Sequence, residues 1–357
     1  MTYFQAVVIA LIQGVTEMFP ISSLGHSVLV PAWFGGSWQT LVTQSSQADS
    51  ESSFYLAYIV ALHCASALAL LWYFRADWVR IIRGFLRSLP ASVRLSIRER
   101  RLRLSVLDKD ERLAWMIIFA TIPVGLTGLL LEHVFRTLFA KPLAAAVFLF
   151  VNGLILLGAE ALRRASLRKQ EGVTVNRTVQ TSAPAYSGNP GYTGAPAAGA
   201  AYAQGAAPAS HRAPSGGRDA ADIADAERSD ERISKLPYKD AIIIGSAQIF
   251  ALLAGISRSG ITMAGGLWRG LDHEDAARFA FLLATPVILA AGVLKVPSLA
   301  GSAGAHIHGQ VVVGFIICGI AGYLSVRFLL RWFQTRTLTP FAIYCLAFGL
   351  ASVLRFI

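Results

Sequence analysis

Charged residues are scarce in this sequence, and their scarcity indicates its class. Lys, Arg, Asp and Glu together make up 15% of the 357 residues, compared with roughly 25% in soluble domains. Hydrophobic residues account for 54%, and the mean hydropathy is +0.53. This composition argues against a soluble protein and indicates an integral membrane protein.

Cysteine is also rare, and the start of the chain lacks a cleavage signal. Cys64, Cys318 and Cys345 fall in apolar stretches without any paired spacing, so they are interpreted as small buried residues and not as a disulfide or a metal site. The first apolar stretch, residues 4–34, has no small-residue cleavage site of the signal-peptide type. We therefore expect this stretch to remain in the mature chain.

Several apolar stretches are long enough to cross a bilayer, which takes roughly 20 residues. The predicted spans cover residues 52–74, 113–135, 141–162, 275–296, 310–332 and 338–356. Two further apolar stretches, residues 4–34 and 240–270, are interrupted by Ser, Gly and charged residues. Each of these two predicts a re-entrant hairpin, which enters and leaves the membrane on the same side.

Lysine and arginine are missing from two loops and concentrated in others. Residues 35–53 and 297–310 contain neither, whereas residues 75–112 and both ends of the segment 163–239 are rich in them. The positive-inside rule therefore places the basic loops in the cytoplasm and the other two outside. The formal charge of +11 is thus explained by orientation and by contact with anionic lipid, and not by nucleic acid. Within residues 75–112, arginines alternate with apolar residues at helical spacing, which predicts an amphipathic helix on the inner leaflet.

The topology predicts an inverted repeat in an all-α polytopic membrane protein. Residues 1–172 and 237–357 each contain one hairpin and three spans, and this odd number of crossings turns the second half upside down. Gln, Ser and Gly recur at one spacing in both hairpins, as Gln13, Ser22 and Gly25 and as Gln248, Ser257 and Gly260. The segment 173–236 between the halves is rich in Ala, Gly, Pro and Ser, and we expect a disordered cytoplasmic linker there.

The chemistry of the chain is concentrated at the two hairpin breaks. Pro20 is expected to end a half-helix, and a second half-helix is expected to begin near His26. Ionisable groups in apolar surroundings are costly, so Glu17, His26 and Arg258 indicate a functional site. A helix start attracts phosphate, and the arginine side chain binds phosphate oxygens in a bidentate manner. The two breaks together therefore favour phosphate chemistry.

Simpler interpretations exist for each of these residues. Either break alone is compatible with an ordinary helix cap, and a buried His26 with a hydrogen bond to a backbone carbonyl. Arg258 is compatible with an extended side chain that reaches the inner surface. His63 lies in the middle of a predicted span, and we expect it to be a core histidine with its hydrogen bonds satisfied.

Both breaks resemble motifs of one known family. The string EMFPISSLGH, residues 17–26, is similar to the Glu-x-x-Pro-x-Ser-Ser-x-Gly-His motif of the undecaprenyl-diphosphate phosphatases, the bacitracin-resistance family. The string GISRSGIT, residues 255–262, resembles that family's second motif, Pro-Gly-x-Ser-Arg-Ser-Gly-x-Thr. The chain departs from the family at Ala254, where proline is usual, and at Gln13, where some members have a second acidic residue. The resemblance covers both halves but not the linker.

The resemblance implies hydrolysis of undecaprenyl diphosphate at the outer face of the bacterial cytoplasmic membrane. This reaction recycles the lipid carrier for peptidoglycan synthesis and confers bacitracin resistance. By the resemblance, Ser23 is the nucleophile, His26 the base, and Arg258 the group that offsets charge in the transition state. Glu17 would orient His26 or hold a divalent cation, Mg²⁺ or Ca²⁺. The substrate-binding residues implied in this way are Gln13, Ser22, Gly25, Ser257, Ser259, Gly260 and Thr262.

The sequence leaves alternatives open for the nucleophile, the metal and the function. The nucleophile could instead be His26 or a water molecule, and a metal requirement is undetermined. The partners expected are a polyprenyl diphosphate and the bilayer, without nucleic acid, and a homo-oligomer is left open. A polyprenyl-phosphate flippase or a secondary transporter is the rival function, because broken helices in inverted repeats are also a transporter plan.

Overall fold

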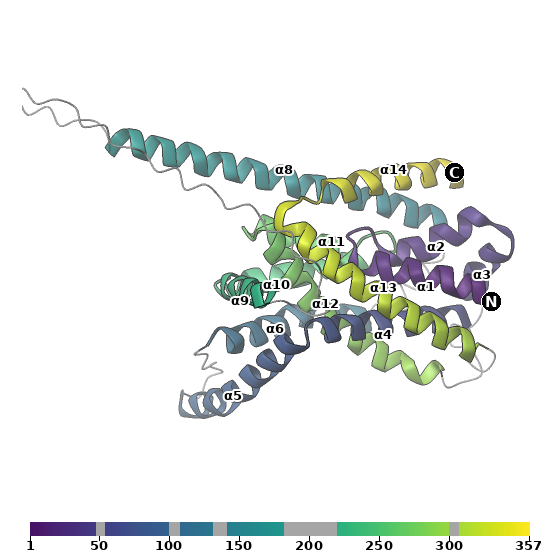
Figure 1. Cartoon of the computed structure of the whole chain (residues 1–357), viewed down its shortest axis with the longest axis horizontal. Coiled ribbons are helices and arrows are strands. Elements are labelled where there is room, and N and C mark those ends of the chain that lie inside the picture. Colours follow the sequence, from purple (N-terminus) through teal and green to yellow (C-terminus); the bar gives the residue numbers. More distant parts are fainter. Residues whose placement is uncertain (48–53, 100–107, 131–140, 182–219, 300–306) are drawn as a thin grey trace, which may run out of the picture.

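The computed structural model describes residues 1–47, 54–99, 108–130, 141–181, 220–299 and 307–357, and every regular element in these ranges is a helix (Figure 1). Three of the helices belong to segments that connect the long helices: α3 (Gly36–Gln47), α5 (Arg75–Glu99) and α9 (Ala220–Ser234). The remaining helices make up two hairpins and six long helices. The all-α fold expected from the sequence is confirmed for the described residues.

The first hairpin breaks where Pro20 predicts it. Helix α1 (Tyr3–Met18) ends two residues before the proline, and α2 (Ser23–Phe34) begins after it. The start of α2 lies three residues before the expected position near His26, because the Ser22 side chain caps the helix by accepting a hydrogen bond from the Gly25 N–H at 3.2 Å.

The second hairpin has the same plan with one addition. Helix α10 (Tyr238–Ser246) continues into a short 3₁₀ helix, η1 (Ala247–Leu252), and α11 (Arg258–Trp268) follows after the break. Ser257 caps α11 by accepting from the Gly260 N–H at 3.1 Å. Both breaks are therefore helix caps, as the simpler interpretation of the sequence held, and the caps are built in the same way.

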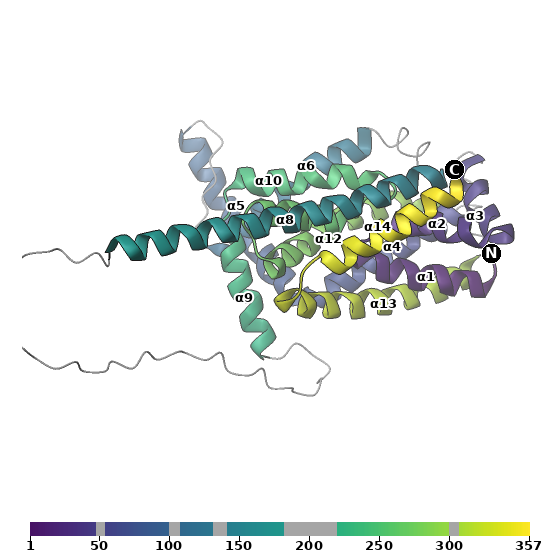
Figure 2. The same ribbon diagram turned by 90° about the horizontal axis from the view of Figure 1, so that it is seen from above.

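All six predicted spans are helices where the structure describes them; residues 52–53 and 131–135 of the predictions lie outside the described residues. The helices are α4 (Phe54–Tyr73), α6 (Lys109–Leu130), α8 (Pro142–Thr181), α12 (His273–Leu299), α13 (His308–Thr335) and α14 (Thr339–Phe356). Five of them are long and apolar enough to cross a membrane by themselves, and α4 meets the test together with α5, from which it is bent by 81°. Helix α8 is about 60 Å long at 1.5 Å per residue, twice the thickness of a hydrocarbon core, and it projects beyond the bundle in Figures 1 and 2.

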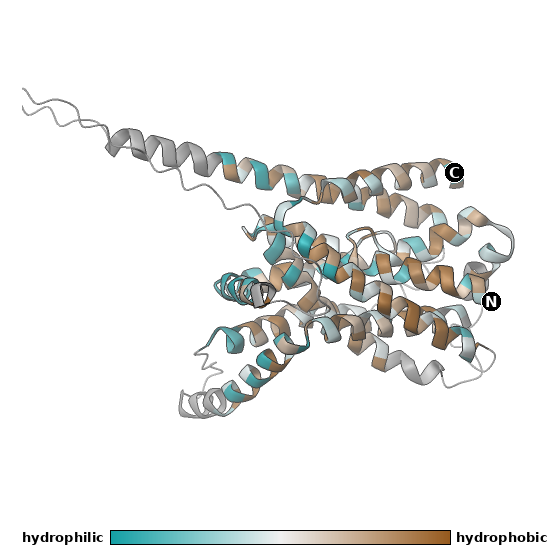
Figure 3. Cartoon of the chain, in the orientation of Figure 1, coloured by the Kyte–Doolittle hydropathy of each residue, from teal (hydrophilic) through white to brown (hydrophobic). Residues whose placement is uncertain are grey.

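The hairpins lie inside the bundle. Helix α1 packs on α13 and α10 on α6, while α4 contacts both α12 and α13 and α8 runs along α14 (Figures 1 and 2). The core around α4 and α12 contains Phe74, Phe279 and Phe281, all nearly inaccessible to solvent. Hydrophobic residues predominate in the middle of the bundle, and hydrophilic ones gather at the end where α5 and α9 lie (Figure 3). This arrangement holds the two breaks at the centre of the molecule.

Helices occupy both ends of the segment 173–236, which was predicted to be a disordered linker. Helix α8 continues to Thr181, and α9 is a helix that packs on the bundle, so the prediction of disorder was wrong for residues 220–234. Asp230 of α9 is buried and accepts hydrogen bonds from Arg278 at 2.7 Å and Arg80 at 2.8 Å. Composition alone could not show that these charged residues find partners on other helices. Residues 182–219 lie outside the described residues.

A second ion pair also holds α9 in place. Arg232 donates two hydrogen bonds of 2.6 Å to Asp275 at the start of α12. These hydrogen bonds raise the pKa of Arg232 above its ordinary value. The guanidinium therefore stays charged, and α9 is anchored by these charged contacts together with the burial of Ile233 in the core.

Candidate active site

The tips of the two hairpins touch. The Gly255 N–H donates a hydrogen bond to Ser22 Oγ at 3.1 Å, so one serine caps its own helix and holds the opposite hairpin. In return, the hydroxyls of Ser257 and Ser259 donate to the Phe19 carbonyl at 3.4 and 3.2 Å. The motifs that lie far apart in the sequence therefore form one junction.

Close approach at this junction requires glycine. A Cβ added to Gly25 would lie 3.0 Å from Gly255 Cα, and one added to Gly255 would lie 2.5 Å from the Ala145 carbonyl oxygen. Gly255 also has a φ of +112°, which side chains rarely adopt. Ser22 has a φ of 69° without being glycine, at a cost of the order of 1–3 kcal/mol. Its hydrogen bonds to both hairpins offset this strain.

Asn152 of α8 bridges the two tips. Its Nδ2 donates to the Pro20 carbonyl at 3.0 Å, and its Oδ1 accepts from the Ser257 N–H at 3.0 Å. The side chain is completely buried. A single amide thus satisfies one backbone group from each break and fixes their relative position.

Glu17 is the centre of the polar cluster. One carboxylate oxygen, Oε1, accepts a hydrogen bond from Arg258 Nη2, and the other, Oε2, accepts from Ser23 Oγ and from Gln13 Nε2, the last at 2.9 Å. His63 Nε2 lies 3.4 Å from Oε2. The side chain of Glu17 is only 4% exposed, so its charge is balanced by Arg258 and not by water. This geometry suits removal of the Ser23 proton by Glu17.

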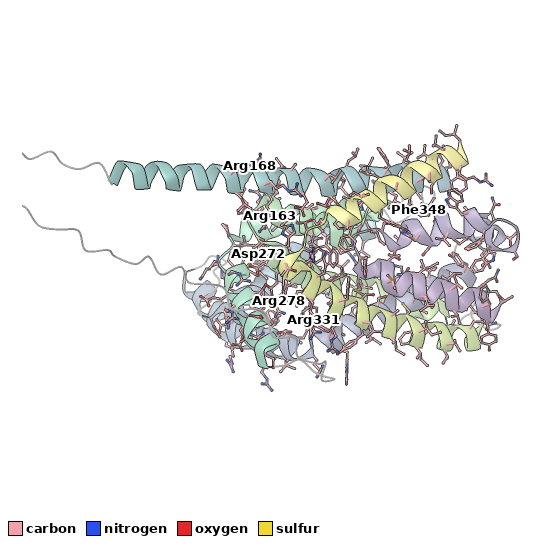
Figure 4. The ribbon with its side chains drawn as sticks, turned by 45° about the horizontal axis from the view of Figure 1, so that its top comes forward. Arg163, Arg168, Asp272, Arg278, Arg331 and Phe348 are labelled. Carbon is pink, nitrogen blue, oxygen red and sulfur yellow. The ribbon has the colours of Figure 1, made fainter. Side chains whose placement is uncertain are left out.

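His26 is directed to different partners. Its Nδ1 donates to the Ser22 carbonyl at 2.7 Å, which leaves Nε2 to accept from the Tyr344 hydroxyl at 2.7 Å. The ring also stacks on Tyr344 and Phe348 of α14, and Figure 4 shows Phe348 on that helix. Among the described residues, neither ring nitrogen is hydrogen-bonded to Ser23 or Glu17. The structure thus pairs Glu17 with Ser23 and Arg258, and it does not show Glu17 orienting His26.

A cavity of about 280 Å³ adjoins this cluster. Its polar wall contains Glu17, Ser23, His63, Gln248 and Arg258. Most of the remaining wall is apolar, and much of it comes from α4, α6, η1 and α12. The N-termini of α2 and α11 both border the cavity, and the N–H groups and dipoles of two helix starts favour an anion. The cavity suits a phosphate group attached to an apolar chain.

Some predicted substrate-binding residues lie beside the cavity and not in it. Thr262 Oγ1 donates to the Arg258 carbonyl at 2.7 Å, a bond within its own helix. Ser259 is occupied by the Phe19 carbonyl, and Gln13 holds Glu17. Gly25 and Gly260 contribute their N–H groups to the two caps. Ser22 and Ser257 do border the cavity.

Three residues at the site were not assigned to it from the sequence. His63 has the core hydrogen bond that was expected, from Nδ1 to the Ile59 carbonyl at 2.8 Å, but its other nitrogen faces Glu17 and the cavity. Asn152 is an isolated amide in an apolar span, and a lone polar residue in such a stretch is a sequence signal that could have identified it. Gln248 matches Gln13 in spacing, and this repeat is the sequence signal that could have placed Gln248 at the site.

The side chains do not fit a metal site formed by the protein alone. Across the described ranges, no group of three or more His, Cys, Asp or Glu side chains is placed to hold an ion. At the cavity, the carboxylate of Glu17 is already bound by Arg258, Ser23 and Gln13. The groups placed to act on a phosphate are therefore side chains and backbone N–H groups.

Comparisons with known proteins show the family of the chain. The family model described as bacitracin resistance protein BacA matches residues 6–182 and 218–351. An undecaprenyl-diphosphatase 2 of Frankia alni is 54% identical over 100% of this chain and 98% of its own length. The undecaprenyl-diphosphatase of Mycolicibacterium paratuberculosis is 49% identical, covering 99% of this chain and 97% of its own, and an undecaprenyl-diphosphatase 2 of Chromobacterium violaceum is 35% identical over 99% of both. The chain belongs to the BacA family of bacitracin resistance proteins.

Proposed function

We propose that this chain hydrolyses undecaprenyl diphosphate to undecaprenyl phosphate and phosphate. The observation that carries the proposal is the hydrogen bond from Ser23 to Glu17, with Arg258 on the other carboxylate oxygen, at a cavity bordered by two helix N-termini. The names of the similar proteins point to the same substrate. Such an enzyme returns the lipid carrier to peptidoglycan synthesis and supports resistance to bacitracin.

The reaction follows from the positions of three side chains. Ser23 Oγ attacks the terminal phosphorus, its proton passes to Glu17, and the bond to the bridging oxygen breaks. Undecaprenyl phosphate leaves with the electron pair and takes the proton from Glu17. Glu17 then removes a proton from water, which attacks the phosphoserine, and returns it to Ser23 as phosphate departs. Arg258 donates to the phosphoryl oxygens throughout.

His26 has a positioning role in this scheme. It binds the carbonyl of the strained Ser22, which precedes the nucleophile, and Tyr344 fixes the other side of its ring. Direct attack by water, with Glu17 as the base, is the alternative reaction.

An inverted repeat is proposed for the bundle. The helix contacts support it, because several of the largest contacts have a counterpart when the halves are exchanged. The α1 contact with α13 corresponds to that of α10 with α6, and the α4–α12 and α8–α14 contacts each relate equivalent helices. The two serine caps correspond in the same way.

The site is proposed to open to the outer face of the bacterial cytoplasmic membrane. The arginines labelled in Figure 4, on α8, α12 and α13, lie toward the end of the bundle where α9 lies. The positive-inside rule assigns that end to the cytoplasm. The opposite end, with α3, then faces outward.

Labelling of single cysteines tests this orientation. Thr40→Cys on α3 should react with an impermeant thiol reagent in intact cells, whereas Ser166→Cys on α8 should react only after permeabilisation. Both positions are exposed, and the native cysteines, two of which are buried, would be replaced beforehand. Reaction of Ser166→Cys in intact cells, with protection of Thr40→Cys, would reverse the proposed orientation.

The polyprenyl chain is proposed to follow a second, apolar cavity of about 540 Å³. This cavity lies in the wedge between α5 and α6, and Trp78 forms part of its wall. It borders the first cavity along two helices: Val124 and Val287 line the first, and the adjacent Gly125 and Pro286 line the second. A chain leaving the phosphate site can therefore remain in apolar surroundings.

Filling this cavity should discriminate between substrates of different length. Gly125→Leu should raise the KM for undecaprenyl diphosphate roughly tenfold, because displacing about two buried methylene groups costs about 1.6 kcal/mol. The KM for farnesyl diphosphate, which has the same head group and a much shorter chain, should change less. Steady-state phosphate release with both substrates gives the comparison.

Gly128→Leu is the matched control. Both glycines lie on α6 with no heavy atom within 4 Å of an added Cβ, but Gly125 lines the cavity and Gly128 does not. Equal KM changes for the two substrates, or the same change in both variants, would show that the chain takes another path.

A further inference from the structure

Gln248 is a buried amide without a partner. Its side chain is 1% exposed, and both Nε2 and Oε1 lack a hydrogen bond within the part of the chain that the structure describes. The residue lies in η1 and lines the cavity beside Arg258. A buried donor and acceptor left unpaired are unfavourable, so the site calls for a polar ligand.

The corresponding glutamine of the first hairpin, Gln13, has the hydrogen-bond partners that Gln248 lacks. Gln13 precedes the capping Ser22 by the same spacing as Gln248 precedes the capping Ser257. The Gln13 amide is satisfied, because Nε2 donates to Glu17 at 2.9 Å and Oε1 accepts from Ser27 at 3.5 Å.

The second hairpin has no carboxylate at the corresponding position. Leu252 stands where the first hairpin has Glu17, and it contributes an apolar surface to the cavity. The amide of Gln248 consequently has the setting of Gln13 without its partner. Its polar atoms lack a partner within the described residues, and the residue itself borders the cavity.

We propose that Gln248 binds the diphosphate group of the substrate. Its amide nitrogen supplies two N–H donors, which suit phosphate oxygens, and its carbonyl oxygen accepts a hydrogen bond from water at the same group. Gln248 and Arg258 then contact the diphosphate from the second hairpin, while Ser23 attacks from the first. This inference rests on the proposed function and adds a substrate-binding residue to it.

Replacement of Gln248 by leucine separates this role from a structural one. Because two unpaired polar atoms are removed, the Tm of Gln248→Leu should equal or exceed that of the natural protein. Its kcat/KM for undecaprenyl diphosphate should fall by roughly 10- to 100-fold, the range for a hydrogen bond to a charged group. Both are measured on the full chain purified in detergent.

Gln5→Leu provides the matched control. Gln5 is also buried, but its amide is paired with Thr2 and Ser37, away from the cavity. This substitution should lower the Tm and leave kcat/KM unchanged, the opposite of the result expected for Gln248→Leu.

Gln248→Glu keeps the shape and adds a negative charge beside the diphosphate. Its KM should rise by roughly 100-fold or more, because the new carboxylate repels the diphosphate. This test remains valid even if Gln248→Leu fails to fold. If kcat/KM were unchanged in Gln248→Leu, or KM unchanged in Gln248→Glu, the amide would bind only water. Absence of phosphate release by the natural protein would instead overturn the proposed function.

Discussion

Arg258→Lys is expected to lower kcat/KM for undecaprenyl diphosphate by about 100- to 1,000-fold, the range for loss of a preorganised donor in the transition state. The substitution keeps the positive charge but removes the planar fork of N–H groups. In the structure, one of these groups binds Glu17 Oε1, and the others remain for phosphate oxygens. Lysine offers a point charge that cannot hold both partners in the same geometry.

Arg269→Lys is the control for this substitution. Arg269 lies at the end of the same helix, pairs with Asp240 at 3.2 Å and stacks on Trp268, and it does not line the cavity. Its kcat/KM should stay within about threefold of the natural value, since this half-buried pair lies away from the cavity. If Arg258→Lys behaved like Arg269→Lys, a shared site at the two hairpin tips would be untenable.

Ser23→Ala is expected to lower kcat by about 1,000-fold or more, and Glu17→Gln by about 100-fold or more. The serine hydroxyl is the group hydrogen-bonded to Glu17, and an amide in place of that carboxylate cannot accept the serine proton. Substrate binding should be affected less than turnover, because the apolar chain supplies much of the affinity. Turnover numbers and binding constants for both variants provide this comparison.

Trapping of the intermediate decides between the two reaction schemes. Acid quenching with substrate labelled in its terminal phosphate should leave label on the natural protein and none on Ser23→Ala. Ser66→Ala, at a buried serine of α4 outside the cavity, should retain both label and turnover. If Ser23→Ala kept kcat within about tenfold and no label were trapped on the natural protein, attack by water with Glu17 as the base would replace the serine scheme.

The sequence by itself determined the six long helices and, to within three residues, the break of the first hairpin. The lengths of the apolar stretches predicted all six long helices, because spanning a bilayer needs a local run of apolar residues. Pro20 and the two capping serines predicted the hairpins, since caps and proline act on the backbone within one turn. The motifs at the breaks also placed the chain in its family and brought Glu17 and Arg258 to one site.

Only the tertiary structure decided which side chains pair with one another. Glu17 binds Ser23 and Arg258, whereas His26 binds Tyr344 on the last helix. The bridge made by Asn152, the unpaired amide of Gln248 and the docking of α9 were likewise invisible in the sequence. The physical reason is that such contacts depend on which helices lie side by side and on the direction of each side chain, and residues distant in the chain set both.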